Sequence, residues 1–433
     1  MRILVLGAAV SGLAAARLAT SQGHSVVVYD AKPERASEII SGGLSAVVGA
    51  WDPDHLTGVD LVVASPGFPE RSAPITDSYE AGVDVVAEFE WAWDQLAVDR
   101  TVAVTGTNGK TTVTALTAEM LSASGVGASA MGNIGVAVSE AVLDPPSVAV
   151  IEVSSAQLQM SRTFHPDIAV VTNVEADHLD WHGSAEAYRR AKEMIVARQG
   201  PTDVVVFSSS DSGATAVASS GVARLLGVDQ FSMADHGFGG DLDSISIAGE
   251  RILRSELAVP PGPFVQNILL ASAAALEAGA RIEPVLDRAR SFTPSAHRQR
   301  TIATIGGVEY VDDSKATNPH AALAAISAYE SVVLIAGGQS KGLDIASLAR
   351  HPNVKAVIAM GESAPLLCAA APGISQEVVS MSEAVEVASG LAVAGDVVLL
   401  SPGGASWDMF DSYAHRGDAF AAAVNEIVER STA

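Results

Sequence analysis

The sequence predicts an α/β protein of three domains, each built on a mainly parallel sheet. Short runs of aliphatic residues, such as Arg2 to Leu6 and Val148 to Val153, alternate with longer segments of helical character. Polar, glycine-containing loops follow several of these runs, as they do at the carboxyl ends of parallel strands. The length of 433 residues corresponds to about three domains of roughly 150 residues each.

The composition excludes several classes of protein. With 48% hydrophobic and 18% charged residues, the chain can bury several cores and is not disordered. A formal charge of −24 argues against a general nucleic-acid or membrane-surface binder. Cys368 is the only cysteine, which excludes an intrachain disulfide and fits a reducing compartment. The apolar start of the chain is too short to span a membrane and fits a strand and turn. We expect a soluble, cytoplasmic protein without nucleic-acid partners or membrane insertion.

The first domain begins with a βαβ pattern. A buried strand at Arg2 to Leu6 leads through GAAVSG (7–12) into a helix that ends near Gln22, and a second strand, Ser25 to Tyr29, ends at Asp30. Ala9 replaces the middle glycine of the dinucleotide fingerprint. The turn is therefore compatible with a uridine or adenosine phosphate and equally with a purely structural role. A strand at 61–64 precedes SPGF (65–68), and we expect a Rossmann-like domain over 1–97.

The strongest motif is TGTNGKTT, residues 105–112. It follows an apolar strand at 101–104 and opens a helix predicted from Lys110 to about Ser124. Backbone N–H groups of such a turn point at phosphate oxygens; Lys110 would reach the β/γ-phosphates and Thr111 would place a hydroxyl on Mg²⁺. Val104 replaces the first glycine of a full Walker A motif. An ordinary glycine-rich turn is the alternative, and Gly-Lys-Thr-Thr favours nucleotide binding. We expect a P-loop-type ATPase domain over 98–299.

Candidate metal ligands follow in the same domain. Glu152 is an acid in an apolar strand, where burial is costly unless the group pairs or binds a metal. A loop after the strand at 168–171 carries Glu175, Asp177, His178, Asp180 and His182. A helix predicted from Ser184 to Arg198 carries Lys192 at the edge of an apolar face. On composition alone, Lys192 is a surface or snorkelling lysine.

The third domain, expected at 300–433, is a second αβ-alternating, Rossmann-like unit. Strands are predicted at 308–311, 332–336, 356–359 and 397–400. Polar loops follow three of them: DDSKATN (312–318), GGQSKGLD (337–344) and SPGGASWD (401–408). Loops of this kind at strand ends are where open α/β sheets bind ligands.

Taken together and in order, these motifs resemble the Mur ligase family of ATP-dependent amide ligases in peptidoglycan precursor assembly. The resemblance covers TGTNGKTT, GNIG (132–135), EVSSAQL (152–158), TNVEADHLD (172–180), Lys192, Asn267, His297–Arg298, DDSKATN and GGQSKG. DSKATN is similar to the branch that adds D-glutamate to UDP-N-acetylmuramoyl-L-alanine. That branch implies an acyl phosphate made from ATP and the acceptor carboxylate, which the amine of D-glutamate attacks.

The resemblance also implies the roles of individual residues. Lys110, His178 and Lys192 would be catalytic, with Lys192 carbamylated to give a carboxylate on a long arm. Two Mg²⁺ sites would use Thr111, Glu152, His178 and Lys192. ATP would be held by Gly106, Thr107, Asn108, Gly109, Lys110, Thr111, Thr112, Asn267, Arg298 and Asp313. The UDP-linked acceptor would contact Val10, Ser11, Asp30, Lys32, Ser65, Gly67, Phe68 and Asn133. D-Glutamate would meet Thr317, Lys341, Ser406 and Tyr413, the last replacing the usual phenylalanine.

Other classes remain as alternatives. A folylpolyglutamate synthase-like ligase shares the cradle. That family begins near its ATP-binding domain, however, whereas about 100 residues precede the cradle in this sequence. An NAD-dependent oxidoreductase would use residues 7–12 and Asp30, and a catalytically silent nucleotide-binding regulator would keep only the cradle. We expect a monomer whose third domain closes on the second, because the ATP and amino-acid residues lie in different domains.

Overall fold

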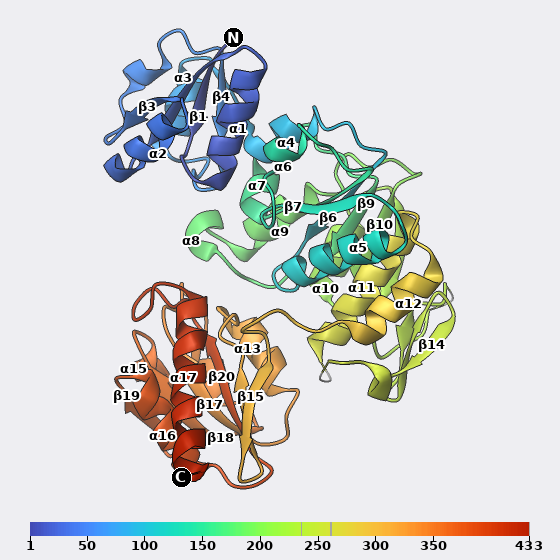
Figure 1. Cartoon of the computed structure of the whole chain (residues 1–433), viewed down its shortest axis with the longest axis vertical. Helices are drawn as coiled ribbons and strands as arrows, with labels where there is room; N and C mark the ends of the chain where they lie inside the picture. The colour runs from blue at the N-terminus through green and yellow to red at the C-terminus, as the bar shows by residue number, and fades with distance from the viewer. Residues whose placement is uncertain (235, 260–261, 433) are drawn as a thin grey trace. The chain divides into compact units, whose positions relative to one another are not determined.

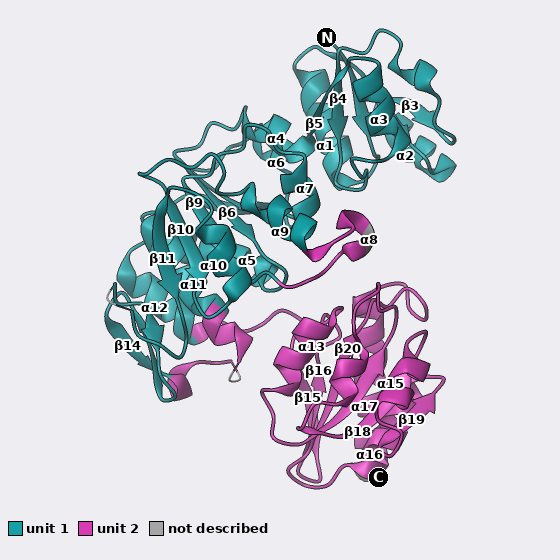
Figure 2. Ribbon diagram, turned by 180° about the vertical axis from the view of Figure 1, so that it is seen from behind, with its two compact units in different colours: residues 1–174, 186–253, 267–290 teal, residues 175–185, 254–266, 291–433 magenta. Residues whose placement is uncertain are grey.

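The structure is a computed structural model, and it describes residues 1–234, 236–259 and 262–432. The chain forms two compact units (Figure 2). The first unit contains Met1–Val174, Glu186–Leu253 and Asn267–Arg290. The second contains Glu175–Ala185, Arg254–Gln266 and Ser291–Ala433.

The N-terminal part of the first unit is a five-stranded parallel sheet in the order β3-β2-β1-β4-β5 (Figure 1). Apolar clusters lie on both of its faces, as expected for parallel strands that are covered on both sides. Its strands are β1 (Arg2–Leu6), β2 (Ser25–Asp30), β3 (Ser45–Val48), β4 (Leu61–Ala64) and β5 (Asp84–Ala87). Its helices are α1 (Val10–Ser21), η1 (Pro33–Arg35), α2 (Ala36–Ser41), η2 (Pro53–Leu56) and α3 (Ala73–Glu80).

Helix α4 (Glu88–Trp93) joins this sheet to the next one. It starts directly after β5, yet Phe89 and Ala92 are buried in the core of the central sheet. The side chains of α4 therefore pack in the central domain, although the domain boundary predicted from sequence lies after them, at residue 97. That boundary stays a prediction.

The central sheet has six parallel strands in the order β11-β10-β9-β6-β8-β7. Its strands are β6 (Arg100–Thr105), β7 (Ala128–Gly132), β8 (Val148–Glu152), β9 (Ile168–Val171), β10 (Val204–Ser208) and β11 (Arg224–Val228). β6, which carries the cradle, lies between β8 and β9, so its carboxyl end is flanked by the two strands that precede the predicted metal ligands. This is the position at which open α/β sheets bind their ligands.

The helices around this sheet are α5 (Lys110–Ala123), α6 (Val138–Ala141), α7 (Ser155–Gln159), α9 (Ala185–Glu193), α10 (Ser212–Ala218), α11 (Pro263–Glu277) and α12 (Ile282–Ser291). A small antiparallel sheet consists of β12 (Gly239–Gly240), β13 (Ser244–Ile247) and β14 (Glu250–Leu253), and η3 (Arg254–Glu256) follows it. The helix predicted to run to Arg198 ends at Glu193. Ile195 and Val196 instead bond three residues back, ahead of Gly200 and Pro201.

The second unit is built on a six-stranded sheet in the order β15-β16-β20-β17-β18-β19. β15 is antiparallel to β16, and the other neighbours are parallel. Its strands are β15 (Arg300–Ile305), β16 (Val308–Asp312), β17 (Val332–Gly337), β18 (Val354–Met360), β19 (Ser375–Val378) and β20 (Val397–Gly403). Its helices are α8 (Leu179–His182), α13 (Pro319–Ile326), α14 (Ala346–Ala349), α15 (Ala364–Ala370), α16 (Met381–Leu391) and α17 (Tyr413–Thr432).

The strand order of this sheet brings three predicted loops to one edge. β20 lies between β16 and β17, and the loops that carry 312–318, 337–344 and 401–408 begin at the carboxyl ends of these three strands. Apolar clusters cover both faces of the sheet. Among the described helices, none is long and apolar enough to cross a membrane.

Candidate active site

The phosphate cradle has the geometry that its sequence predicts. β6 ends at Thr105, the loop turns through two glycines with positive φ, and α5 begins at Lys110. Gly106 has φ 147° and Gly109 has φ 87°. A Cβ on Gly109 would lie 2.6 Å from Oδ1 of Asn267, so this loop needs glycine for its backbone and for the neighbouring side chain. The cradle and Asn267, which come from distant parts of the chain, therefore lie together in the first unit.

The segment after β9 braces the cradle. The backbone N–H of Thr107 donates to the carbonyl of Asn173 at 2.8 Å. The N–H of Asn108 donates to Oδ1 of the Asn173 side chain at 2.9 Å, and its carbonyl accepts from Nδ2 of the same side chain at 3.0 Å. Asn173 thus holds the loop on both its donor and its acceptor side, which keeps the loop preorganised for phosphate.

Two lysines meet at one carbonyl of the loop. Nζ of Lys110 donates to the carbonyl oxygen of Gly106 at 2.8 Å, and Nζ of Lys192 donates to the same oxygen at 2.7 Å. Lys110 also donates to the carbonyl of Thr107 at 3.0 Å. Lys192 is only 1% exposed, and its Nζ lies 4.7 Å from the ring centre of Tyr188. The Tyr188 hydroxyl in turn hydrogen-bonds to Oγ1 of Thr107 at 3.0 Å.

Glu152 is a buried carboxylate with one oxygen unused. It is 2% exposed at the end of β8, and its Oε1 accepts from Nδ2 of Asn133 at 3.0 Å. Its Oε2 is buried and has no hydrogen-bond partner in the described structure. An unsatisfied buried carboxylate oxygen is costly unless a cation binds it, so Glu152 fits a metal ligand. Thr111, at the first turn of α5, is half-buried.

The loop after β9 leaves the first unit at Glu175 and returns at Glu186. His178, in this loop, is exposed and has a left-handed backbone with φ 49°. Asp177 is buried; its Oδ1 accepts from the N–H of His178 at 2.8 Å and its Oδ2 accepts from Nδ2 of Asn318 at 3.0 Å. Of the predicted ligands in this loop, the side chain of Asp180 lies outside the described residues.

A preformed metal site is absent from the described part of the chain, where no three His, Cys, Asp or Glu side chains gather. Mg²⁺ commonly takes one or two protein carboxylates and completes its shell with substrate phosphates and water. The single unsatisfied oxygen of Glu152 beside a phosphate cradle fits that mode of binding.

Asp30, at the end of β2, accepts hydrogen bonds from the backbone of the N-terminal domain. Oδ2 of Asp30 accepts from the N–H of Ala8 at 2.8 Å, and Oδ1 accepts from the N–H of Lys32 at 3.0 Å. Asp30 therefore braces the turn at the start of α1. Ser65, at the end of β4, is buried and its Oγ has no described hydrogen-bond partner. A Cβ added to Gly12 would lie 2.8 Å from that oxygen, so Ser65 faces the turn.

Except for Asn133, which follows β7 of the central sheet, the other predicted UDP residues lie at the same end of the first sheet. Val10 begins α1 and is 70% exposed, Lys32 and Gly67 are exposed, and Ser11 and Phe68 are half-buried. The ring of Phe68 lies 6.2 Å from that of Tyr29. The structure thus places all of these residues around the carboxyl ends of β1, β2 and β4.

In the second unit, Asp313 is a buried acid at the end of β16. Burial raises the pKa of Asp313 to about 7, against the opposing effects of Ser401 and Arg298. Its Oδ2 accepts from Oγ of Ser401 at 2.9 Å, and its Oδ1 accepts from the N–H of Gln299 at 3.3 Å. Asp313 thereby connects the predicted nucleotide residue Arg298 to the strand ends of this sheet.

Arg416 connects two of the predicted amino-acid loops, 312–318 and 401–408. It is 2% exposed on α17; its Nε donates to Oγ of Ser314 at 3.0 Å and its Nη2 donates to the carbonyl of Ser314 at 2.8 Å. Its Nη1 donates to the carbonyl of Gly404 at 3.1 Å. Burial lowers the pKa of Arg416 to about 10, although Asp408 and Asp312 oppose this.

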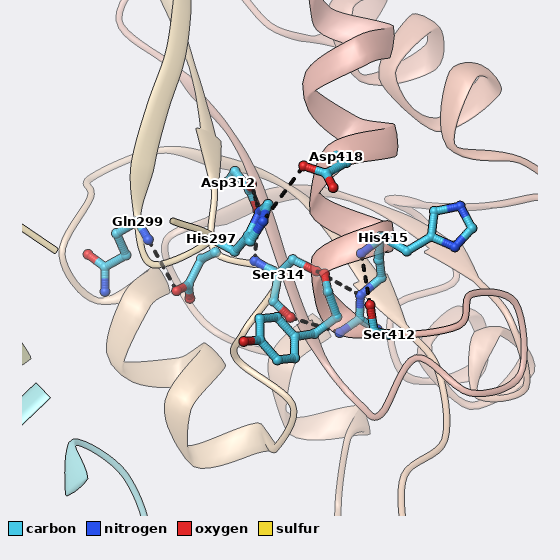
Figure 3. A network of polar contacts seen from close by, with 10 residues as sticks. His297, Gln299, Asp312, Ser314, Ser412, His415 and Asp418 are labelled. Atoms are coloured by element: carbon cyan, nitrogen blue, oxygen red, sulfur yellow. Dashed lines mark hydrogen bonds and ion pairs between the residues drawn. The ribbon is translucent and has the colours of Figure 1, made fainter. Parts of the chain in front are cut away.

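Next to Arg416, His297 and Asp312 form a close pair. Nδ1 of His297 lies 2.7 Å from Oδ2 of Asp312, and the other oxygen of Asp312 accepts from the N–H of Ser314 at 2.9 Å (Figure 3). Asp312 and Ser314 lie in the DDSKATN loop, but no sequence pattern indicates that they or Arg416 belong to the site. The burial of an arginine is visible only once α17 is folded onto the strand ends.

The predicted D-glutamate residues share this edge. Ser406 is buried, Thr317 and Lys341 are half-buried, and Lys341 has φ 53°. The ring of Tyr413 lies 4.8 Å from Nζ of Lys315 and meets the His297 ring edge-on at 6.2 Å. Of the five described non-glycine residues with positive φ, four are His178, His297, Gln299 and Lys341. Such backbone strain is typical of functional sites.

Comparisons with known proteins agree with this arrangement. Three family models match in order: the Mur ligase MurD-like, N-terminal domain over 1–87, the Mur ligase middle domain over 104–275, and the Mur ligase, glutamate ligase domain over 297–404. A curated relative from Frankia casuarinae, named UDP-N-acetylmuramoylalanine--D-glutamate ligase, is 40% identical over 98% of this chain and 93% of its own. A relative of the same name from Pelotomaculum thermopropionicum is 38% identical over 97% and 96%.

Among solved structures, the MurF ligase of Thermotoga maritima, determined in complex with ADP, matches with a TM-score of 0.62 at 16% identity. The match covers 94% of this chain and 96% of that one, and at this identity it supports the fold. The predicted three-part α/β fold is confirmed. With family models over most of the chain and relatives at 38–40% identity over nearly all of it, the chain belongs to the Mur ligase family.

Proposed function

We propose that this protein is an ATP-dependent amide ligase that adds D-glutamate to UDP-N-acetylmuramoyl-L-alanine in peptidoglycan precursor synthesis. The observation that carries the proposal is the similarity to D-glutamate ligases at 38–40% identity over nearly the full chain. The braced cradle with Lys110, and the unsatisfied oxygen of Glu152, support an ATP-dependent reaction. A carboxylic acid must be activated before an amine can displace an oxygen from it, and ATP supplies that activation.

The proposed reaction has two steps. A carboxylate oxygen of the acceptor attacks the γ-phosphorus of ATP, the bond to the β-phosphate oxygen breaks, and ADP leaves from an acyl phosphate. The neutral amine of D-glutamate then attacks the acyl carbon, and the tetrahedral intermediate collapses to an amide and phosphate as the nitrogen loses a proton. Both reactants of the first step are anionic, so the step depends on cations and aligned donors. Lys110 and the backbone N–H groups of the first turn of α5 would supply them.

Mg²⁺, when bound, would neutralise phosphate charge and orient the γ-phosphoryl group for transfer. Thr111 and Glu152 are the proposed protein ligands on the nucleotide side, and the buried Oε2 of Glu152 supports this. His178 is proposed to hold a second Mg²⁺ near the acceptor carboxylate. Its exposed imidazole leaves it accessible to a cation.

Lys192 is proposed to be carbamylated and to serve as a further oxygen ligand. Its amine would add to CO₂ to give an N-carboxylate, with loss of one proton. Burial favours the neutral amine that this addition needs, and Lys192 is 1% exposed. Nζ of Lys110 lies on the same carbonyl oxygen, that of Gly106, and a neighbouring positive charge also favours the neutral amine of Lys192. Carbamylation would place a negative charge beside Lys110.

The remaining substrate contacts are proposed by position. Asn267, Arg298 and Asp313 would hold the nucleotide, and the contact between Asn267 and the cradle supports the first of these. The acceptor would bind through Val10, Ser11, Asp30, Lys32, Ser65, Gly67, Phe68 and Asn133. D-Glutamate would bind through Thr317, Lys341, Ser406 and Tyr413, since a cation and a hydroxyl suit a side-chain carboxylate.

The acceptor is linked to a nucleotide and D-glutamate is a free amino acid, and both are metabolites of the cell interior. We therefore also propose that the enzyme acts in the cytoplasm. Separately, we propose that it is a monomer.

A panel of acceptors and amino acids tests the proposed function. Phosphate release is measured with D-glutamate, L-glutamate, L-alanine or meso-diaminopimelate, each with its matching UDP-linked acceptor and with a folate. We expect release only with UDP-N-acetylmuramoyl-L-alanine and D-glutamate together. Release with L-glutamate and a folate would identify a folylpolyglutamate synthase-like enzyme instead, and release without any amino acid would contradict the ligase reaction.

A further inference from the structure

Helix α4 forms a packed joint between the N-terminal and central domains of the first unit. It packs against α1 of the N-terminal domain and α6 of the central domain. Phe89 and Trp93 each meet the ring of Phe164 edge-on, with centroids 5.1 Å apart. Met160 packs against apolar clusters of both domains. We call α4, α6 and residues 160–164 the α4 joint.

Glu90 holds one side of this joint through a single oxygen. Its Oε1 accepts hydrogen bonds from three successive backbone N–H groups, those of Arg162, Thr163 and Phe164, at 2.7, 2.6 and 2.8 Å. The side chain is 1% exposed. Successive amides that converge on one anion form a nest, and hydrogen bonds to a charged acceptor are among the stronger ones in proteins.

Glu88 holds the other side. Its Oε1 accepts from the backbone N–H of Ser139 at 3.2 Å and from the Ser139 hydroxyl. The side chain is 2% exposed, and burial raises the pKa of Glu88. Ser139 lies in α6, directly after the turn at 132–135. Glu88 therefore anchors the helix that follows this turn.

The two anchored segments both lead back to Glu152. In the turn before α6, the N–H of Asn133 donates to the carbonyl of Glu152, and its Nδ2 donates to Oε1, both at 3.0 Å. On the other side, β8 ends at Glu152 and continues through α7 into residues 160–164. The carboxylate with the unused oxygen thus lies between two segments whose far ends are held by α4.

Burying two carboxylates is expensive, and apolar side chains would pack the same joint at lower cost. Here backbone amides and a hydroxyl, rather than cations, satisfy them in the described structure. Directional hydrogen bonds fix an orientation that apolar packing alone leaves free to slide. This combination indicates a requirement for precise placement.

We propose that Glu88 and Glu90 are positioning residues for the ligase reaction. They fix the N-terminal domain relative to Glu152 and the cradle, so that an acceptor anchored on the N-terminal domain presents its carboxylate at the phosphates. The inference rests on the proposed function for its kinetic consequence only. Neither residue touches substrate; both act through the turn at 132–135 and residues 160–164.

The kinetic test compares Glu90→Ala, Glu90→Gln and Glu88→Gln with a matched control at the same joint. The control is Asp84→Asn, which removes an exposed ion pair with Arg162 (3.7 Å). We expect Glu90→Ala to keep the Kd of UDP and of ADP within about twofold, because the predicted UDP residues and the cradle each stay intact within their own domains. The same variant should lower kcat at least tenfold, because the two domains are no longer held in register. Both glutamine variants keep an acceptor oxygen and should retain most of kcat, and Asp84→Asn should match the wild type.

A second measurement does not depend on activity. Spin labels at S37C and S220C, both exposed and in the two domains of the first unit, are introduced in a C368S background. Their distance distribution should be narrow in the parent protein and in D84N, and should broaden in E90A. Amide hydrogen exchange at residues 162–164 should accelerate in the same variant.

A Glu90→Ala protein with wild-type kcat, or with an unchanged distance distribution, overturns the inference. A loss of kcat that is matched by equal losses of affinity for UDP and ADP and of folded protein also overturns it, because that pattern indicates a purely structural residue. If the wild type itself fails to release phosphate with D-glutamate, the proposed function is wrong, and the distance measurement still decides whether the joint is fixed.

Discussion

Lys110 and Lys192 both donate to the carbonyl oxygen of Gly106, at 2.8 and 2.7 Å. They reach this atom from different elements: Lys110 begins α5, and Lys192 lies near the end of α9. Lys110 is half-buried and Lys192 is 1% exposed, so two basic side chains approach one backbone carbonyl. A carbamate on Lys192 would place a negative charge beside Lys110, and the first prediction depends on this.

The first prediction concerns Lys192. Lys192→Ala should lower kcat roughly 100-fold or more, because it removes an electrostatic contact at the reacting phosphate. Short carboxylic acids such as acetate or formate should restore part of this activity, since they can occupy the space of a carbamate. Phosphate release measures both effects. Lys110→Ala is the control and should not be rescued by an acid; full activity of unrescued Lys192→Ala would sink the carbamate proposal.

Glu152→Gln tests the metal site. The variant keeps the shape and the hydrogen bond to Asn133 but loses the charge on the unsatisfied oxygen. We expect the apparent affinity for Mg²⁺ to fall roughly 10-fold or more, measured as Mn²⁺ binding by electron paramagnetic resonance with ADP present. Glu140→Gln, which changes an exposed carboxylate of α6, is the control. Equal Mn²⁺ binding by wild type and Glu152→Gln would remove Glu152 from the metal site.

Arg416→Met should disturb the amino-acid loops. It removes three hydrogen bonds to Ser314 and Gly404 and leaves their buried acceptors unsatisfied. We expect the free energy of unfolding to fall by about 2 kcal/mol, and the KM for D-glutamate to rise while the Kd of UDP is unchanged. Arg430→Met, an exposed arginine on the same helix, should change neither. An unchanged KM for D-glutamate in Arg416→Met would show that the hydrogen bonds of Arg416 do not shape the D-glutamate site.

Asp313 gives a pH dependence of stability. Its folded pKa of about 7 lies above the ordinary value of 3.8, so folding favours the protonated acid. Stability from this group is greatest at low pH and is lost as pH rises from about 4 to about 7. Asp313→Asn stays neutral and lacks this loss. The difference in unfolding free energy, variant minus wild type, should therefore increase by about 1.4 kcal/mol for each pH unit between about 5 and 6, and by less as the pH approaches 7.

Chemical denaturation at fixed pH values measures this difference. Gln376→Ala, which removes an exposed uncharged side chain of the same unit, serves as the control and should show a flat profile. A flat profile for Asp313→Asn would mean that Asp313 is ionised in the folded protein throughout this range.

The parts of the fold that sequence predicts best are those determined by local chemistry. Strand β6, the turn and the start of α5 follow from an apolar run, two glycines that need positive φ, and Lys-Thr-Thr. Strands at the edge of a sheet are harder to predict from sequence. β7 reads Ala-Ser-Ala-Met-Gly, which has no β-branched residue, and its pairing with β8 decides its conformation.

The contacts that complete the site depend on residues far apart in sequence. Arg416 bonds to Ser314 across 102 positions, and His297 meets Asp312 across 15. No pattern within a single helix or strand indicates such a pair. The carboxylates of α4 also depend on residues far away in sequence. Nothing in the sequence around Glu90 indicates its role, and only the fold shows that the backbone amides of residues 162–164 donate to it.

The measurement that tests the central claim most directly follows oxygen from acceptor to phosphate. UDP-N-acetylmuramoyl-L-alanine labelled with ¹⁸O in its terminal carboxylate is incubated with the enzyme, ATP and D-glutamate. Formation of an acyl phosphate predicts that the released phosphate carries one ¹⁸O and that the product mass increases by one glutamyl residue. Unlabelled phosphate, or phosphate released at the same rate without D-glutamate, would contradict the account.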